Sequence, residues 1–314
     1  MSERFGARCE SGAAGRTAAD RGVSEVISFA LVFSLIAATV ALVYVSGIGG
    51  LENTRSSEQV NNAERAFDVL ADNIGDIHRQ AAPSRATEIK VSDAQMEFGD
   101  RVRVNITIRN KMGGNVSVIE YQPIVYSADG GTDLVYANGA LFREDRSGTV
   151  MDKNPPFLLT LDEGPDDTAG TADDEKTLIL PVIETRNVGP ESTGSQRTVL
   201  VRTLLAIREV TIAEDDPGDV DTSVFANPRD DNPDGTTGTE YNVTVRIQSS
   251  PDRNEIWHDY IEEQVAEAGG NFDARAGSSS ACDIIDVGGT ETVECSLAAE
   301  NVYSTATRID VIYR

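Results

Sequence analysis

The sequence predicts an α+β protein: a long N-terminal helix, transmembrane and then soluble, followed by a mainly antiparallel β-sandwich-like domain with one late helix. Three observations support this fold class. An uncharged apolar segment lies near the N-terminus, residues with heptad spacing follow it, and most of the remaining chain alternates apolar and polar residues in short runs. Heptad spacing is typical of packed helices, and alternation with period two is typical of strands.

The apolar segment runs from Val26 to Ile48 without a charged residue. At ~1.5 Å per helical residue it extends about 35 Å, enough to cross the hydrocarbon core of a bilayer. The leader before it has an excess of arginine, with Arg21 at the membrane edge, whereas Glu52 opens an acidic region beyond it. The positive-inside rule therefore predicts a single-pass membrane protein with a cytoplasmic N-terminus and an extracellular C-terminal domain.

A conventional secretory signal is the alternative interpretation of this segment. Such a signal has an apolar core of about 7–15 residues, followed by a small-residue cleavage site. The core of this chain is longer, and the residues after it, Tyr44 to Gly50, make a poor site of that kind. We therefore expect the apolar segment to stay on the protein.

The residues Arg21-Gly22-Val23-Ser24-Glu25 place a basic and a small residue directly before the apolar helix. This junction resembles the prepilin-type (class III) signal of archaeal type IV pilins and archaellins. The resemblance implies that a prepilin-type peptidase cleaves on the cytoplasmic side, between Gly22 and Val23, and leaves the helix on the mature protein. Downstream, the run from Glu64 to Gln80, followed by Ala82 to Ile89, looks like a group of haloarchaeal pilin-like surface proteins, and this similarity covers about the first 110 residues. Bacterial-type pilins have a glutamate at the fifth mature position, whereas Glu25 would be third, so their filament packing is not carried over.

The resulting organisation has four parts: a cleaved cytoplasmic leader at 1–22, a transmembrane pilin-like helix at 23–50, an amphipathic helix at 51–82 and an extracellular β-rich domain at 83–314. Glycines 47, 49 and 50 are expected to end the membrane helix. The second helix has a heptad seam, and Pro83 stops it. The seam consists of Val60, Ala63, Phe67, Leu70, Ile74, Ile77 and Ala81. It either docks on the chain's own domain or packs against neighbouring subunits.

Strands follow from Ala86 onward. The segment 100–109 alternates without error, with Val102, Val104, Ile106 and Ile108 on one face. Further strands are predicted at 116–127, 133–137, 156–161, 176–183, 197–212, 241–248, 282–287, 290–297 and 301–313. A late helix begins at Ser250-Pro251 and ends at Gly269-Gly270. Its apolar face comprises Trp257, Tyr260, Ile261, Val265 and Ala268.

Two cysteines remain after loss of the leader, which carries Cys9. Cys282 and Cys295 are symmetric about Gly288-Gly289, a two-residue hairpin signal. Counting outward from this turn places the two cysteines opposite each other at a non-hydrogen-bonded position, where the Cα atoms are close enough for a disulfide. The sequence therefore predicts a Cys282–Cys295 bridge, which also favours an extracellular location.

Three Asn-x-Ser/Thr sequons begin at Asn105, Asn115 and Asn242. Strand alternation predicts that all three asparagines point to solvent, which makes them candidates for N-glycosylation. The alternative is that they are ordinary polar strand residues. Two acidic loops, 162–175 and 230–235, space carboxylates as Ca²⁺-binding loops do, but neither matches the EF-hand pattern. We expect solvated loops and no cofactor there, with Ca²⁺ as the alternative.

The net charge of −25 excludes a general affinity for nucleic acid, because phosphates need a basic patch. Such self-repulsion is screened in molar salt, which indicates a halophilic protein. His78 and His258 are the two histidines, and packing or surface roles fit both better than metal binding. No hydrolase, zinc-protease or nucleotide-binding motif is present, so we expect a protein that is not an enzyme.

These observations predict a membrane-anchored, pilin-like cell-surface protein with a structural or adhesive role. Its partners would be the lipid bilayer, a prepilin-type peptidase and other pilin-like subunits of a surface filament. The alternative is a monomeric anchored extracellular binding module that is not assembled into filaments.

Overall fold

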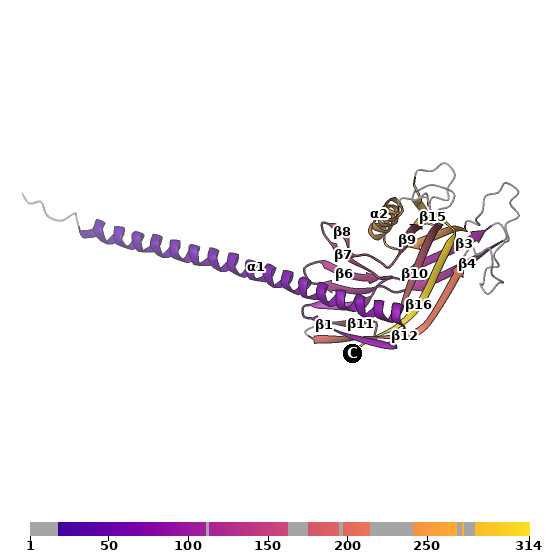
Figure 1. Cartoon of the computed structure of the whole chain (residues 1–314). Coiled ribbons are helices and arrows are strands. Elements are labelled where there is room, and N and C mark those ends of the chain that lie inside the picture. Colours follow the sequence, from indigo (N-terminus) through magenta and orange to yellow (C-terminus); the bar gives the residue numbers. More distant parts are fainter. Residues whose placement is uncertain are drawn as a thin grey trace, which may run out of the picture. The chain divides into compact units, whose positions relative to one another are not determined.

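The computed structural model describes residues 18–110, 113–162, 175–194, 197–213, 241–268, 272 and 280–314 (Figure 1). The chain divides into two compact units, Met1–Ser57 and Glu58–Arg314. The first unit contains helix, and the second contains three sheets and a late helix. The predicted α+β class with mostly antiparallel sheets is therefore confirmed.

The N-terminal helix α1 runs without interruption from Ala18 to Gln80. The predicted break at Gly47 to Gly50 is therefore wrong. A glycine inside a helix costs about 1 kcal/mol relative to alanine, but it keeps its backbone N–H and so does not end the helix as proline would. The prediction that Ala81 is the last residue of the seam is also wrong. Ala81 lies outside the helix with a positive φ of 53°, and its side chain is exposed.

The first sheet has the strand order β1-β12-β16-β10-β9. Its central pair, β10 and β16, is parallel, whereas its other neighbouring strands are antiparallel. The strands are β1 (Ser84–Val91), β12 (Arg197–Ala213), β16 (Asn301–Tyr313), β10 (Glu175–Asn187) and β9 (Leu158–Asp162). The parallel pair is a departure from the antiparallel pattern that short alternating strands predict.

The second sheet has the order β11-β2-β5-β6-β7-β8 and is antiparallel throughout its described strands. These are β11 (Ser192–Gly194), β2 (Ala94–Phe98), β5 (Ile124–Ala128), β6 (Thr132–Ala137), β7 (Ala140–Asp145) and β8 (Gly148–Lys153). Ala140, Leu141 and Phe142 are buried in succession because both faces of β7 are covered. A strand buried on both faces does not alternate, which is why the period-two pattern does not predict β7.

The third sheet has the order β14-β15-β13-β3-β4 and is also antiparallel. Its strands are β14 (Cys282–Asp286), β15 (Glu291–Ala299), β13 (Tyr241–Gln248), β3 (Val102–Asn110) and β4 (Gly113–Tyr121). The predicted single strand 116–127 is divided between β4 and β5, which belong to different sheets. Pro123 lies at the division and lacks the N–H that a continuous central strand needs.

The late helix α2 spans Pro251–Glu267, as predicted, and buries Trp257, Tyr260 and Ile261. Its N-cap Ser250 makes no side-chain capping hydrogen bond. The fully buried Asn254 organises this end instead. Its Oδ1 accepts a hydrogen bond from the Ser249 backbone N–H at 3.1 Å, and its Nδ2 donates to the Glu291 carbonyl oxygen at 2.9 Å.

Two hydrophobic cores hold the domain together. The first lies between the inner face of the third sheet, α2, and residues of the first and second sheets. The second brings the C-terminal part of α1 together with the first and second sheets. The second sheet therefore contributes to both cores, with Val135 in one and the adjacent Leu134 and Tyr136 in the other.

Candidate functional site

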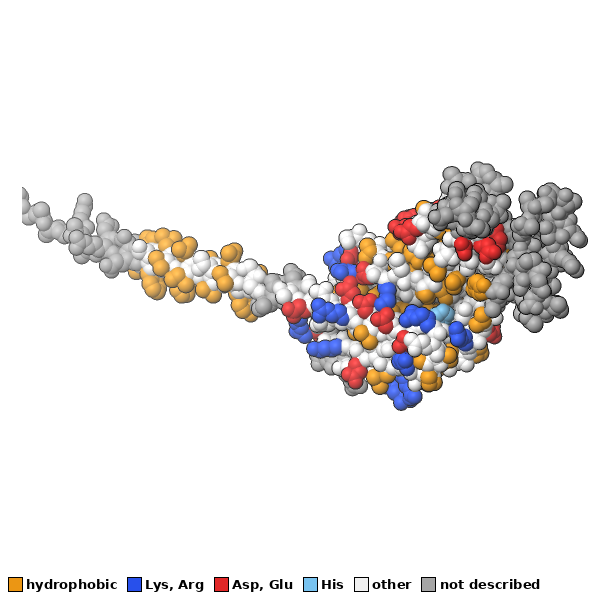
Figure 2. Space-filling model, viewed as in Figure 1, with side chains coloured by type: hydrophobic (Ala, Val, Ile, Leu, Met, Phe, Trp, Pro, Cys, Tyr) orange, Lys and Arg blue, Asp and Glu red, His pale blue; other side chains and the backbone are white. Residues whose placement is uncertain are grey.

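The most unusual surface of this chain is the N-terminal part of α1. Every side chain from Val26 to Gly47 is exposed, and none carries a charge. Figure 2 shows the hydrophobic side chains of this helix without an acidic or basic neighbour among them. Within the described residues, this is the one helix that is long and apolar enough to cross a membrane. An apolar surface on all sides of a helix is unfavourable in water and suits lipid or a packed apolar partner.

Two hydroxyl groups in this segment are hydrogen-bonded to carbonyl oxygens of the helix itself. Thr39 Oγ1 donates to the carbonyl oxygen of Ile36 at 2.9 Å, and Ser46 Oγ donates to that of Leu42 at 2.7 Å. Both hydroxyls are therefore satisfied within the helix. Neither needs water, so neither carries the cost of an unpaired polar group in hydrocarbon.

The predicted cleavage junction lies inside the same helix. The backbone of Gly22 and Val23 is helical, because α1 begins at Ala18, but their side chains lie outside the described residues. Most of the leader, including Cys9, also lies outside them. Processing between Gly22 and Val23 therefore stays a prediction.

The heptad seam of α1 is buried in the chain's own domain. Phe67, Leu70, Ile74 and Ile77 are fully buried, and Val60 and Ala63 nearly so. They pack in one core with residues of the first and second sheets, where the Phe67 ring meets Tyr126 edge to face. Of the two interpretations of the seam, docking on its own domain is the one observed. This face of α1 is consequently not available to a neighbouring subunit in the folded domain.

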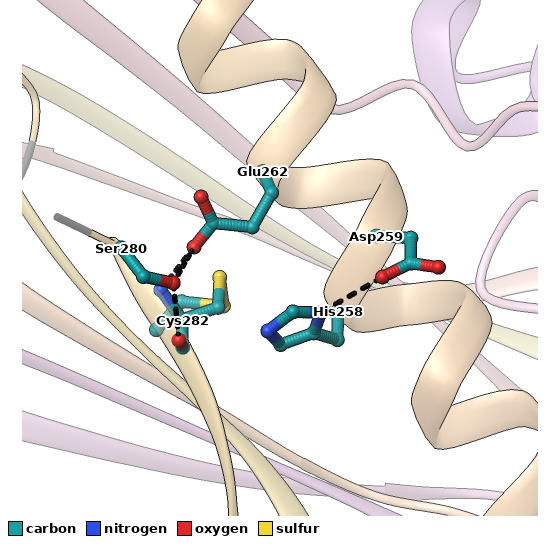
Figure 3. The surroundings of a disulfide bond; sticks show 6 residues. His258, Asp259, Glu262, Ser280 and Cys282 are labelled. Carbon is teal, nitrogen blue, oxygen red and sulfur yellow. Dashed lines mark hydrogen bonds and ion pairs between the residues drawn. A yellow bond between two sulfur atoms is a disulfide. The ribbon is translucent and has the colours of Figure 1, made fainter.

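The predicted disulfide is present between Cys282 and Cys295, with the Cα atoms 4.0 Å apart (Figure 3). The strand register of this hairpin is the one that counting outward from Gly288-Gly289 predicts. The Val287 N–H donates to the Thr290 carbonyl oxygen at 2.9 Å, and Cys282 lies opposite Cys295. Gly288 and Gly289 both have positive φ, which a two-residue turn of this type requires. Local counting along a hairpin was therefore sufficient to predict the bridge.

The surroundings of the disulfide were not predicted. A carboxylate oxygen of Glu262, on α2, accepts hydrogen bonds from the Cys282 backbone N–H at 2.6 Å and from Ser280 Oγ at 2.7 Å (Figure 3). Both cysteines are fully buried, which indicates a structural bridge. His258 Nδ1 lies 2.9 Å from a carboxylate oxygen of the adjacent Asp259 on the same helix, consistent with a surface role. Glu262 carried no sequence signal, because it is one of many acidic residues in this chain.

The three sequons lie in different environments on the third sheet. Asn242 is exposed on β13, whereas Asn105 on β3 and Asn115 on β4 are half-buried. Asn115 pairs with Ile108, so it lies on the core-facing side of the sheet, and the expectation that it points to solvent is wrong. Val116 and Val118 are the exposed residues of β4. β4 is an edge strand paired with β3, and its valines share the outward face of the sheet with Thr107 and Asn105.

A groove of about 550 Å³ lies beside β4, where its residues face β10, β12 and β16 of the first sheet. Its charged side chains are largely paired with each other. Arg308 binds Glu184 at 2.8 Å, and Arg103 next to the groove binds Glu120 at 2.7 Å. The residues that line the groove include neither cysteine nor histidine.

Metal binding finds no support in the part of the chain that the structure describes, where no group of three or more His, Cys, Asp or Glu side chains is placed to hold an ion. Residues 163–174 and 230–235, the predicted acidic loops, lie outside the described residues. His78 is buried at the end of α1, with Nδ1 2.8 Å from Thr307 Oγ1. This contact gives it the packing role that was expected.

The fold and the exposed apolar helix define the class: a β-rich domain that follows a helix able to span a membrane. Within that class, the chain belongs to a family of unknown function, DUF7289, whose model matches residues 21–312. The match therefore begins at Arg21 and includes both the apolar helix and the β-rich domain. No curated protein matches the chain. No solved structure matches it either.

Proposed function

We propose that this chain is a membrane-anchored, pilin-like cell-surface protein with a structural or adhesive role. A prepilin-type peptidase removes residues 1–22 on the cytoplasmic side. The helix from Val23 onward then anchors the protein in the bilayer, and the β-rich domain lies outside the cell. In a filament, the apolar helices of neighbouring subunits replace the lipid around each other.

The observation that supports this proposal most directly is the exposed apolar surface from Val26 to Gly47. A helix that is apolar on every side is stable only in lipid or among similar helices. The junction before this helix, Arg21-Gly22-Val23, resembles the prepilin-type signal that such a peptidase cleaves. The family match spans residues 21–312 and so includes the proposed junction between Gly22 and Val23. The disulfide is consistent with an extracellular domain.

A monomeric anchored binding module is the second candidate, and the buried seam of α1 favours it. Phe67, Leu70 and Ile74 are fully buried in the chain's own domain. Subunit contacts through the seam of α1 are therefore excluded in the folded domain. If the N-terminal part of α1 serves only as an anchor, the protein stays single in the membrane and acts through its domain surface.

Leader processing can be tested with a substitution at the junction. A bulky residue in the Gly22→Leu variant should block the peptidase, so that the protein keeps residues 1–22 and its intact mass rises accordingly. The Gly15→Leu variant is the matched control, because it makes the same change within the leader but away from the junction. A mature mass for Gly22→Leu equal to that of the wild type would contradict the prepilin interpretation.

Filament assembly can be tested separately from processing. Filaments sheared from cells that produce the wild-type protein should contain it, as identified by mass spectrometry and electron microscopy. Cells that produce Gly22→Leu should lack it in this fraction. A processed, membrane-bound protein that is absent from sheared filaments would favour the monomeric anchored module.

A further inference from the structure

We propose that Asn242 is the N-glycosylation site of the folded domain, and that the sequons at Asn105 and Asn115 are not used. This inference rests on the proposed function in one respect, because the domain must lie outside the cell. It goes beyond that function by naming one modified side chain and by ranking three sequons that the sequence alone leaves equal.

Asn242 is presented outward at the beginning of β13. Burial alternates along this strand, with Tyr241, Val243 and Val245 facing the core and Asn242 exposed. Thr244, which completes the sequon, lies two residues on and so on the same outward face. The cross-strand neighbours of Asn242 are Arg109 on β3 and Ala298 on β15. The Arg109 side chain is exposed, whereas Ala298 is only 3% exposed, so among the described residues the open side of Asn242 is the side toward β3.

Asn105 lies on the same outward face as Asn242, and its strand β3 is paired on both sides, as β13 is. Val118 of β4 and Arg246 of β13 lie directly opposite Asn105, which is half-buried where Asn242 is exposed. Its Oδ1 accepts a hydrogen bond from Thr107 Oγ1 at 3.3 Å, and Thr107 itself is only 9% exposed. The Thr107 hydroxyl, which a transferase must recognise, is therefore buried and already hydrogen-bonded to the acceptor asparagine.

Asn115 lies on the opposite face of the sheet. It pairs with Ile108, and Ser117, which completes the sequon, pairs with Ile106 and lines the groove beside β4. Both polar side chains are half-buried. A glycan on Asn115 would have to leave from the core-facing side of an edge strand, between the first and third sheets. This sequon is therefore poorly placed for a transferase that acts on the folded domain.

The transfer uses a polyprenyl-phosphate-linked oligosaccharide as donor. The Asn242 side-chain nitrogen forms a new bond to C1 of the first sugar, and the bond between C1 and the phosphate oxygen breaks. The phosphate leaves with that electron pair, and the amide nitrogen gives one proton to a base of the transferase. The lipid-linked donor is held at the outer membrane surface, where the anchored domain also lies.

The experiment is a tryptic digest of the full-length protein purified from the membranes of its native host. Trypsin places the three sequons on separate peptides, 230–246 for Asn242, 104–109 for Asn105 and 112–143 for Asn115. We expect glycan mass on 230–246 and unmodified masses for the other two. The Asn242→Gln and Thr244→Val variants should lose the glycan, whereas Thr244→Ser, which keeps a hydroxyl, should retain it.

Digestion of intact cells with an added protease separates failure of this inference from failure of the proposed orientation. If the domain is digested from outside and 230–246 is unmodified, the glycosylation inference is wrong and the orientation stands. Glycan mass on 104–109 or 112–143 would also overturn it. If the domain is protected and unmodified, the proposed extracellular location and the inference fall together. Glycan loss in Asn105→Gln or Asn115→Gln would likewise contradict the assignment.

Discussion

At the scale of single residues, Glu262 shows how one side chain links two elements. It lies on α2, yet its carboxylate accepts a hydrogen bond from the backbone N–H of Cys282, the first residue of β14, at a distance of 2.6 Å. The helix is therefore fixed to the strand that carries the disulfide. The bridge and the carboxylate stabilise the same corner of the first core, which also contains Trp257 and Ile261.

The disulfide gives the first prediction. Non-reducing mass spectrometry of the purified protein should show the peptides with Cys282 and Cys295 linked, with two hydrogens fewer than in the reduced form. Reduction should lower the free energy of unfolding by up to about 3 kcal/mol, and by less if the hairpin persists in the unfolded chain. Quantitative alkylation of both cysteines without a reductant would contradict the bridge.

His78 gives the second prediction, which concerns pH. Burial lowers the pKa of His78 to about 4, and the positive charges of Arg208 and Arg79 add to this effect. In the unfolded chain the imidazole has its ordinary pKa of 6.5. Between these values the unfolded state binds a proton that the folded state does not, so the stability should fall as the pH falls from about 6.5 to about 4.

The His78→Gln variant isolates this effect from other groups. Burial raises the pKa values of Glu64 and Glu144, and a raised carboxyl pKa stabilises the fold as the pH falls, opposite to the histidine. The difference in unfolding free energy between wild type and variant should therefore decrease by up to about 3 kcal/mol on acidification. Chemical unfolding at fixed high salt measures it, and a pH-independent difference would refute the histidine assignment.

At the scale of elements, α1 has two parts with different environments. From Val26 to Gly47 its side chains are exposed and apolar, whereas from Val60 to Ile77 one face is buried and the opposite face carries charges. Lys153 of β8 reaches Asp72 on this charged face at 2.9 Å, but both groups are partly solvated, and such a pair contributes little stability. The buried seam is what holds this part of the helix to the domain.

Adjacent positions on α1 give the third prediction with its own control. Leu70→Asp places a carboxylate in a fully buried site and should destabilise the domain by at least about 3 kcal/mol. Val69→Asp makes nearly the same change one residue earlier, where the side chain is 52% exposed, and should cost within about 0.5 kcal/mol. Thermal unfolding of the detergent-solubilised chain compares them. Equal melting temperatures would show that the seam does not stabilise the domain.

At the scale of the whole molecule, the charge balance sets the conditions in which the fold is stable. The net charge is −25 at pH 7. Close pairs such as Arg308–Glu184 and Arg186–Asp310 relieve only part of the repulsion. Folding brings the remaining carboxylates closer together than they are in the extended chain, so the repulsion acts against the compact state.

Salt dependence is the fourth prediction. The melting temperature should rise steeply from dilute buffer to molar NaCl, because the screening length falls from about 30 Å at 0.01 M to about 3 Å at 1 M. The same titration with a neutral osmolyte at matched water activity serves as a control for general exclusion effects. A melting temperature that is constant or falls with salt would contradict the proposed adaptation to high salt.

The sequence predicted those features that depend on residues close together along the chain. The apolar segment, the alternation of β3, the bounds of β13 and β16, and the opposition of Cys282 and Cys295 all follow from local periodicity or from counting across one turn. For the candidate site, local pattern predicted the apolar helix, the bridge and the exposure of Asn242. The leader junction and the Ca²⁺ alternative stay predictions.

Only the tertiary structure decided the features that depend on which distant segment covers a residue. Alternation in β4 separates Val116 and Val118 from Asn115 and Ser117, but only the pairing of the polar residues with Ile108 and Ile106 places them on the core-facing side. The seam of α1 has the same pattern whether its partner is its own domain or another subunit. Glu262 is one acidic residue among many until α2 packs beside β14. A sequence pattern indicates that a face will be buried or bonded, whereas the identity of its partner is set by free energies that arise only when the whole chain packs.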